Sequence, residues 1–363
     1  MSVYEERLQK DLTSIREQVG DLSARTEETV KGAVESVLRF DRRLANETML
    51  RDRAINRGTR ELELKCHHFV VRHFPSAGHL RYASSVLRLC VILERIGDYA
   101  VTVCREVVQL SGPLPEGVLR DAELLGHQAQ RILAQAIRAF REGNVELAKS
   151  VKVMAEQVED TFQKVFDDLV ATGEREARPV KDLFAALLIL KALKRVTDQA
   201  DNMASQAVFT VAGETKEPKT FRILFADETN TCQSQMAEAY ARRAYPVSGY
   251  YTSAGWNPGS KLDPAFVEFM DERGYDLRNR KPKRLEPLDD EHRHYHVIVS
   301  LDGTARPHLD EVPFRTAMLE WDVGPIPSDL QVNGAKAQME EVYRRIVHEV
   351  RNLMDLLRGP DAE

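Results

Sequence analysis

Apolar residues recur every three or four positions through most of the first 211 residues, which is the spacing of helices that bury one face. The stretch "LRYASSVLRLCVILERIGDYAVTVCREVVQL" (80–110) shows this period clearly. Proline and glycine gather at the breaks between such stretches, at residues 73–79, 111–117, 140–144 and 174–180. Long helices joined by short breaks predict an all-α bundle.

An internal repeat divides this helical region. "LERIGDYA" (93–100) and "LKRVTDQA" (193–200) each close a long apolar helix that follows a proline-bearing break. Such self-similarity indicates two tandem copies of one supersecondary unit. We therefore predict two three-helix repeats, at residues 1–112 and 113–211.

The pattern changes after a polar linker at residues 212–220. Through residues 221–363 strand-like runs alternate with helical patterns, the runs being "FRILFA" (221–226), "GYYTSAG" (249–255) and "YHVIVSL" (295–301). The helical patterns cover residues 235–245, 264–274 and 335–358. This alternation predicts a three-layer α/β domain with a parallel sheet, whose ligands bind at the carboxyl ends of the strands. A polar loop that begins at Asp227 lies at such an end.

Composition narrows the class of protein. The chain has 363 residues, 43% of them hydrophobic and 30% charged, with a net charge of −6 and no long basic run, so we expect several folded domains and no nucleic-acid partner. The longest apolar run, residues 183–190, is far shorter than the roughly 20 residues of a membrane span. Four cysteines without metal-type spacing indicate reduced thiols. We expect a cytoplasmic protein without a membrane span.

The helical region resembles the PhoU family of phosphate-uptake regulators over residues 1–215. The phrases that carry the resemblance are "FPSAGHLRY", "LERIGDYAVTV" and "DNMASQAVFTVAGE". The resemblance implies a regulator of phosphate uptake and phosphate signalling that acts by binding proteins. The implied partners are the nucleotide-binding subunit of a phosphate ABC transporter and a phosphate-sensing histidine kinase, and a homodimer remains an open alternative.

The same resemblance implies a metal-binding E-x-x-x-D motif in each repeat. Carboxylates four residues apart share a helix face and offer hard oxygen ligands. The first copy is intact as Glu94 and Asp98, whereas in the second Lys194 replaces the glutamate, Asp198 remains and Asp201 lies nearby. Because an ammonium group cannot bind a metal, we expect a divalent or ferric ion at the first repeat only. The alternative is that Glu94 and Asp98 form a solvated or salt-bridged helix face.

Residues 221–358 resemble low-molecular-weight protein tyrosine phosphatases and their arsenate-reductase relatives. "RILFADETNTCQSQMAEAYARR" and "SAGWNPGSKLDPAFVEFMDERGYDLRNRKPKRL" carry this resemblance. In that family a nucleophilic cysteine opens the phosphate loop, an arginine follows six positions later, and a distant aspartate beside a proline acts as the acid. The matching positions here hold Asp227, Gln233 and Ile326. Since thiolate, guanidinium and acid are all replaced, we expect a degenerate loop in a pseudoenzyme.

The shape of the loop is expected to survive. Asn230 and Ser234 match positions that brace it, and backbone amides at a helix amino terminus attract anions. The Asp227 carboxylate would repel an incoming oxyanion about 4 Å away by roughly 4 kcal/mol at an effective dielectric near 20. We therefore expect Asp227 to accept the loop amides itself. Cys232 reads as a small buried thiol, with a redox sensor as the alternative.

Other functions remain open on the sequence. The main rival is an active phosphatase or arsenate reductase that uses atypical residues and is targeted by the helical module. Phosphorylation of Asp227 itself and a metal-buffer role of the helical module are weaker alternatives. His292, His294 and His296 alternate before a strand, and we interpret them as a polar loop rather than a metal site.

Overall fold

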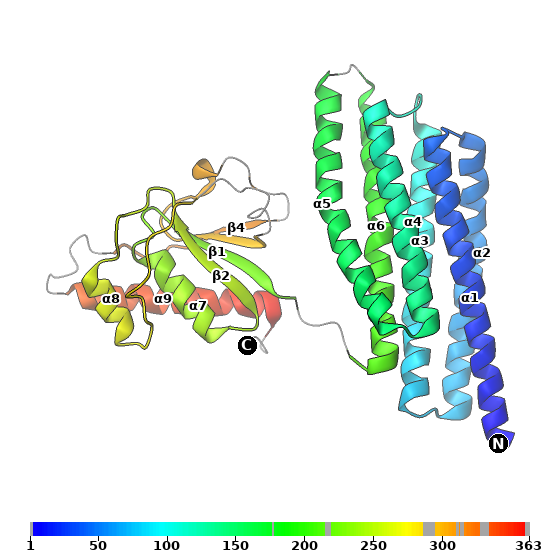
Figure 1. The fold of residues 1–363 in the computed structure, drawn as a ribbon, viewed down its shortest axis with the longest axis horizontal. Helices are drawn as coiled ribbons and strands as arrows, with labels where there is room; N and C mark the ends of the chain where they lie inside the picture. Colours follow the sequence, from blue (N-terminus) through cyan, green and yellow to red (C-terminus); the bar gives the residue numbers. More distant parts are fainter. Residues whose placement is uncertain are drawn as a thin grey trace. The chain divides into compact units, whose positions relative to one another are not determined.

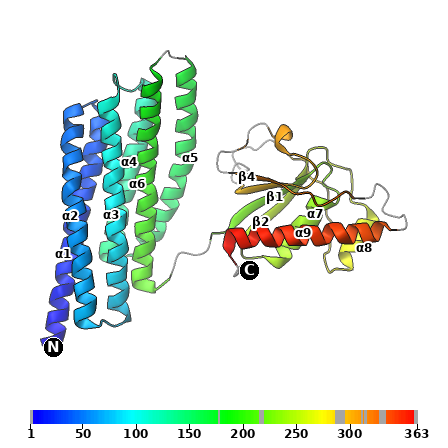
Figure 2. The same cartoon turned by 180° about the vertical axis from the view of Figure 1, so that it is seen from behind.

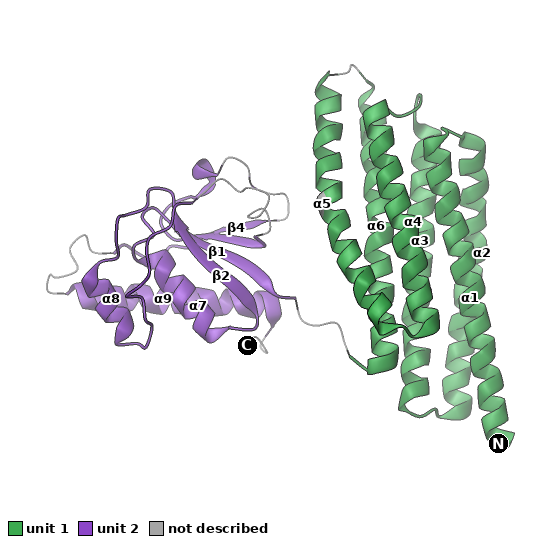
Figure 3. Ribbon diagram, in the orientation of Figure 1, with its two compact units in different colours: residues 1–216 green, residues 217–363 purple. Residues whose placement is uncertain are grey.

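The structure, a computed structural model, describes residues 3–175, 178–214, 219–285, 295–309, 312, 316–326 and 334–359 (Figure 1). The chain divides into two compact units, Met1–Lys216 and Glu217–Glu363 (Figure 3). Across the described ranges, no helix has both the length and the apolar character that crossing a membrane requires.

The first unit is a bundle of long helices packed side by side (Figures 1 and 2). In its described part these are α1 (Val3–Leu38), α2 (Arg42–His73), α3 (Ala77–Gln109), α4 (Glu116–Glu142), α5 (Val145–Arg175) and α6 (Val180–Ala212). Helix α3 packs against α6, α2 and α1, while α4 packs against α6, α5 and α1. The predicted all-α region is confirmed.

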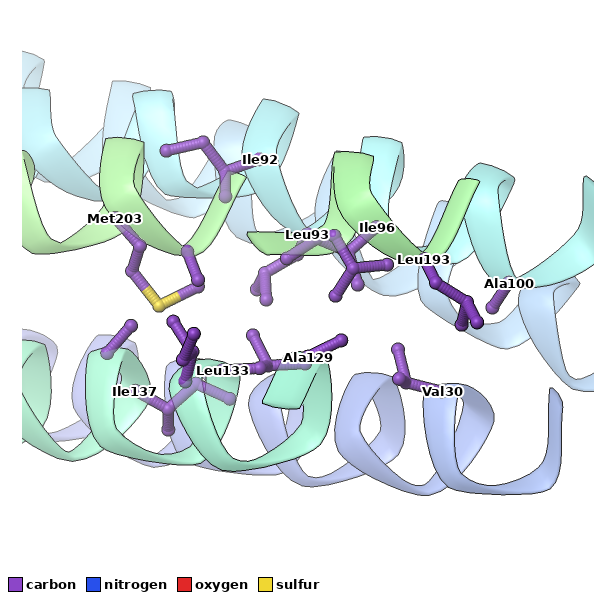
Figure 4. Packing of buried hydrophobic residues seen from close by; sticks show 14 of the residues in the cluster. Val30, Ile92, Leu93, Ile96, Ala100, Ala129, Leu133, Ile137, Leu193 and Met203 are labelled. Atoms are coloured by element: carbon purple, nitrogen blue, oxygen red, sulfur yellow. The ribbon is translucent and has the colours of Figure 1, made fainter. Parts of the chain in front are cut away.

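One continuous hydrophobic core runs through this bundle. Figure 4 shows side chains of α3 and α6 meeting side chains of α4 and α1 across it, among them Leu93, Ile96, Leu193, Met203, Ala129, Leu133, Ile137 and Val30. These residues follow the three- and four-residue spacing of the sequence, which places them on one face of each helix.

The turn between α1 and α2 was not among the predicted breaks. It contains neither glycine nor proline, and Phe40 adopts a left-handed backbone with φ of 48°. Helix α2 then begins because the Asp41 side chain accepts a hydrogen bond from the Leu44 amide at 2.9 Å, as an N-cap aspartate does.

The second unit contains a parallel sheet of strands β1 (Phe221–Asp227), β2 (Gly249–Gly255), β3 (Val297–Ser300) and β4 (Ala317–Glu320), in the order β2-β1-β3-β4. The described helices of this unit are α7 (Gln233–Ala244), α8 (Pro264–Asp271) and α9 (Ala335–Arg358). The predicted α/β fold with a parallel sheet is therefore confirmed. Strand β4 was not predicted, because it is short and only half-buried.

Alternate residues of β1 face different cores. Ile223 and Phe225 join the larger core with residues of α7, α8 and α9, whereas Leu224 lies in a smaller cluster with Ile298 and Leu309. Burial on both faces is typical of a central parallel strand. The carboxyl end of β1, at Asp227, is therefore held in a fixed position.

Candidate functional site

The loop between β1 and α7 packs directly on the end of β2. Strand β1 ends at Asp227 and α7 begins at Gln233. A Cβ atom added at Gly255 would lie 2.7 Å from the Asn230 nitrogen and 2.7 Å from the Glu228 carbonyl oxygen, so only glycine permits this approach. Asn230 itself adopts the left-handed backbone, with φ of 51°. The loop thus curls back over the strand end.

The centre of this loop is filled by the Asp227 carboxylate. Oδ1 accepts a hydrogen bond from the Asn230 amide at 2.5 Å, and Oδ2 accepts one from the Ser234 amide at 2.8 Å. Asp227 is only 3% exposed. The expected self-filling of the loop is confirmed: the carboxylate takes the amide hydrogens that a bound oxyanion would need.

The charge at this position is also costly to bury. Burial raises the pKa of Asp227 and the Asp302 carboxylate acts in the same direction, while the hydrogen bonds from Ser234 and Asn230 act against it. An additional oxyanion in the loop would meet a buried carboxylate and would find two amides already engaged. The geometry therefore disfavours phosphate binding here.

Side-chain hydrogen bonds keep the loop in shape. Asn230 Nδ2 donates to Ser234 Oγ at 2.8 Å, and Asn230 Oδ1 accepts from Gln235 Nε2 at 3.0 Å and from the Lys283 amide at 2.7 Å. Asn230 and Ser234 are both completely buried. The curled loop is thus braced independently of any ligand.

The positions of the family's arginine and acid have structural contacts instead. Gln233 Nε2 donates to the Gly324 carbonyl oxygen at 2.7 Å, which ties the loop to the segment that leads to Ile326. Ile326 packs against the larger core of this unit. An amide cannot supply the positive charge of a guanidinium, and a hydrocarbon side chain has no proton to donate.

Cys232 is a buried free thiol, 8% exposed. Burial raises its pKa well above the ordinary value, and the negative charges of Asp227 and Asp263 act in the same direction. The thiol is therefore protonated at neutral pH and is a poor nucleophile. The other three cysteines lie in the first unit and are also free and buried.

In the second helical repeat, an internal cation stands between two carboxylates. The Lys194 Nζ atom lies 2.8 Å from Asp198 Oδ1 and 2.8 Å from Glu159 Oε2 of α5, and the residue is 8% exposed. Asp201 lies half-buried one turn further along α6. Glu159 was not foreseen, because it comes from a different helix than the motif.

The corresponding carboxylates of the first repeat differ in this respect. Within the described ranges, Glu94 and Asp98 form no ion pair. Asp52 of α2 lies against Gly97, one residue from Asp98, and its buried Oδ1 has no hydrogen-bond partner in the described part of the chain. Burial raises the pKa of Asp52, and Asp98 and Glu94 raise it further. These three carboxylates are thus electrostatically coupled.

Asp52 was missed by the sequence reasoning, although a signal was present. It occupies the buried stripe of α2 between Thr48 and Ile55, where a charged residue is unexpected. In the described residues, no group of three or more His, Cys, Asp or Glu side chains is arranged to hold a metal ion. The metal site at Glu94 and Asp98 remains a prediction.

Of the histidine cluster, His292 and His294 lie outside the described residues, and His296 Nδ1 accepts a hydrogen bond from the Arg222 amide at 3.0 Å.

The described residues form a helical bundle followed by a parallel α/β unit with a strand–loop–helix cradle. Comparison with known families agrees. Residues 19–107 and 123–207 match the PhoU domain, and residues 222–360 match the low molecular weight phosphotyrosine protein phosphatase family. The chain therefore contains a PhoU region and a low-molecular-weight phosphatase-like domain.

Individual relatives each match part of the chain. A phosphate-specific transport system accessory protein PhoU homolog from Pseudomonas aeruginosa is 28% identical over 205 residues, which are 56% of this chain and 84% of that protein. The crystal structure of PhoU from Pseudomonas aeruginosa superposes with a TM-score of 0.55 at 27% identity, covering 57% of this chain and 99% of that one. An arsenate reductase from Archaeoglobus fulgidus is 21% identical with a TM-score of 0.29, covering 36% and 98% respectively.

Proposed function

We propose that this protein regulates phosphate uptake and phosphate signalling by binding other proteins, and that its second domain is a pseudophosphatase. The PhoU matches support the first half, since the relatives carry the name of a phosphate transport accessory protein. The partners we propose are the nucleotide-binding subunit of a phosphate ABC transporter and a phosphate-sensing histidine kinase. The protein would bind both partners in the cytoplasm.

The observation that carries the pseudophosphatase proposal is the self-filled loop. Asp227 stands where the family has its nucleophile, and its two oxygens accept the Asn230 and Ser234 amides. Catalysis by this family's mechanism needs a thiolate at the helix amino terminus and a guanidinium for the phosphate oxygens. Here the only cysteine of the loop is Cys232, whose raised pKa keeps it protonated. The domain would then serve as a docking surface.

We also propose a metal site at the first helical repeat. Glu94 and Asp98 would supply hard oxygen ligands, and the nearby Asp52 of α2, whose buried Oδ1 has no hydrogen-bond partner in the described part of the chain, would add negative charge that favours a cation. A buried carboxylate oxygen without a hydrogen-bond partner is costly, and a nearby cation would offset that cost. When bound, the ion would neutralise carboxylates that otherwise repel one another across α2 and α3. In the second repeat, Lys194 already provides that positive charge.

Affinity capture tests the regulatory proposal. The tagged full-length chain would be recovered from cells grown in replete and in limiting phosphate, and the bound proteins identified by mass spectrometry. We expect the transporter ATPase or the sensor kinase, in amounts that change with phosphate. If neither protein is recovered from cells grown in replete or in limiting phosphate, the proposal is contradicted.

The enzymatic rival is tested separately. The purified full-length chain is assayed with an aryl phosphate and with arsenate plus a thiol reductant, beside Asp227→Ala. We expect no turnover above the buffer rate for either protein. Turnover that Asp227→Ala abolishes would establish the rival, an active phosphatase or arsenate reductase with atypical residues.

A further inference from the structure

A second charged cluster lies beside the loop, centred on Glu238 of α7. The Glu238 residue is completely buried, and its Oε2 accepts a hydrogen bond from Ser253 Oγ of β2 at 2.6 Å. Three basic side chains reach the same carboxylate: Arg280 at 2.5 Å, Arg242 at 3.0 Å and Lys283 at 3.6 Å. They come from α7 and from the segment that follows α8, so the fold brings them together.

The cluster carries more positive charge than its own acid can neutralise. Glu238 contributes one negative charge, the three bases contribute three positive charges, and the difference is two. Among the described residues, Glu238 is the only acidic side chain paired with any of the three. Exposed Lys281 and Arg284 add further positive charge on the same segment. This concentration is notable in a chain whose net charge is −6.

The three bases are held in place and remain accessible. The Lys283 amide donates to Asn230 Oδ1 at 2.7 Å and its carbonyl accepts from the Gly255 amide at 2.8 Å, so its backbone is fixed to the loop and to β2. Arg242 Nε donates to the Tyr251 carbonyl at 2.9 Å. The side chains of Arg242, Lys283 and Arg280 are nevertheless 50%, 46% and 27% exposed. An anion from solvent could therefore contact all three.

The three bases repel one another as well as being attracted to Glu238. The pKa of Lys283 is lowered chiefly by burial, and Arg280 and Arg242 lower it further although Glu238 acts in the opposite direction. A second anion on the solvent side of the cluster would relieve this repulsion. Two guanidinium groups would offer paired N–H donors, and the ammonium group a point charge, which is the donor set that phosphoryl oxygens favour.

We propose that Arg242, Arg280 and Lys283 form a binding site for a dianionic phosphoryl group, either free inorganic phosphate or a phosphorylated protein side chain. Glu238 positions the three bases and does not itself touch the ligand. The site is distinct from the loop that Asp227 fills, and it does not depend on whether that loop is inactive.

The test is calorimetric titration of the full-length chain with inorganic phosphate at low ionic strength. We expect the wild type to bind, and Lys283→Gln to weaken binding about tenfold because one charged hydrogen bond is lost. The matched control is Arg278→Gln, which removes a base of the same segment that pairs with Asp276 at 2.9 Å instead of with Glu238. The control should bind like the wild type.

Lys283→Gln leaves Arg242 and Arg280 to neutralise Glu238, so the domain should stay folded, which tryptophan fluorescence verifies. An Arg280→Gln, Lys283→Gln double variant should bind more weakly still. Titration with a phosphoserine peptide and its serine counterpart identifies the source: tighter binding of the phosphopeptide than of phosphate indicates a protein ligand, and the reverse indicates free phosphate. No binding to the wild type, or equal loss in Arg278→Gln, would overturn the proposal.

Discussion

At the scale of single residues, Asp227 decides what the phosphatase-like loop can do. A thiolate at this position would leave the loop amides free for a substrate, whereas the carboxylate reaches two of them, those of Asn230 and Ser234. The exchange retains the fold of the loop because the replacement supplies the anion that the amides need. The proposed loss of phosphatase chemistry would thus begin with Asp227, and Gln233 and Ile326 would extend it, because they stand in place of the guanidinium and the acid.

The buried carboxylate makes the stability of the second unit depend on pH. The pKa of Asp227 is raised by burial above its ordinary value of 3.8, so the folded state binds this proton more tightly than the unfolded chain. The unfolding free energy therefore falls as pH rises from 3.8 through the raised pKa, and it is constant above. Asp227→Asn has no such proton to lose. We expect the variant to gain stability relative to the wild type over this interval.

Urea unfolding followed by tryptophan fluorescence measures this, because both tryptophans of the chain, Trp256 and Trp321, lie in the second unit. The control is Asp276→Asn, whose carboxyl is exposed and has its pKa lowered to about 2 by Arg278. Relative to the wild type, that variant should lose stability as pH rises from about 2 to 3.8, which is the opposite sign, and should show no further change above 3.8. If the unfolding free energy of the wild type instead rises relative to that of Asp227→Asn as pH rises, the fold stabilises the charged carboxylate and the prediction is wrong.

At the scale of elements, hydrophobic periodicity located the long helices and the main strands well. Helix α9 spans Ala335–Arg358, the range expected from its pattern. The pattern failed where an element is short or its boundary is set by side chains: β4 is a four-residue half-buried strand, and the α1–α2 turn depends on the Asp41 cap. Contacts between elements, such as Lys194 with Glu159, could not be read from spacing along one helix.

The pseudophosphatase proposal can also be tested at this scale, by introducing the family's catalytic groups on two elements. The residues to replace lie on two elements: Asp227 and Gln233 at the β1–α7 loop, and Ile326 on the segment that Gln233 contacts through Gly324. We expect Asp227→Cys, Gln233→Arg and Ile326→Asp together to hydrolyse an aryl phosphate, because the braced loop then regains thiolate, guanidinium and acid. Each of the three single substitutions should give no measurable rate, since the effects of catalytic groups that act as a unit are strongly non-additive.

Adding Cys232→Ser to the triple variant is the control for which thiol reacts. Its turnover should match that of the triple variant, whereas returning the introduced cysteine to Asp227 should abolish it. A triple variant that is folded by tryptophan fluorescence but inactive would mean that more than three groups separate this loop from an enzyme.

At the scale of the whole molecule, the unfolding of the two units can be followed by different spectroscopic signals. The first unit is almost entirely helical and contains no tryptophan, while both tryptophans report on the second. A metal ion held by Glu94 and Asp98 would stabilise the first unit alone, by about 2.7 kcal/mol at a hundredfold excess over Kd. We expect Mn²⁺, a hard ion suited to carboxylates, to raise the helical melting transition by several degrees. The tryptophan transition should not move.

The variant Glu94→Gln, Asp98→Asn should abolish that shift, and elemental analysis of the purified proteins should show metal in the wild type only. Glu61→Gln, which removes an exposed carboxylate of α2, is the matched control and should respond like the wild type. Lys194→Met removes the internal cation of the second repeat but leaves the first repeat unchanged, so the shift that depends on Glu94 and Asp98 should persist in this variant. A shift that survives Glu94→Gln, Asp98→Asn would place the ion elsewhere, and no shift with any protein would leave Glu94 and Asp98 as a solvated helix face.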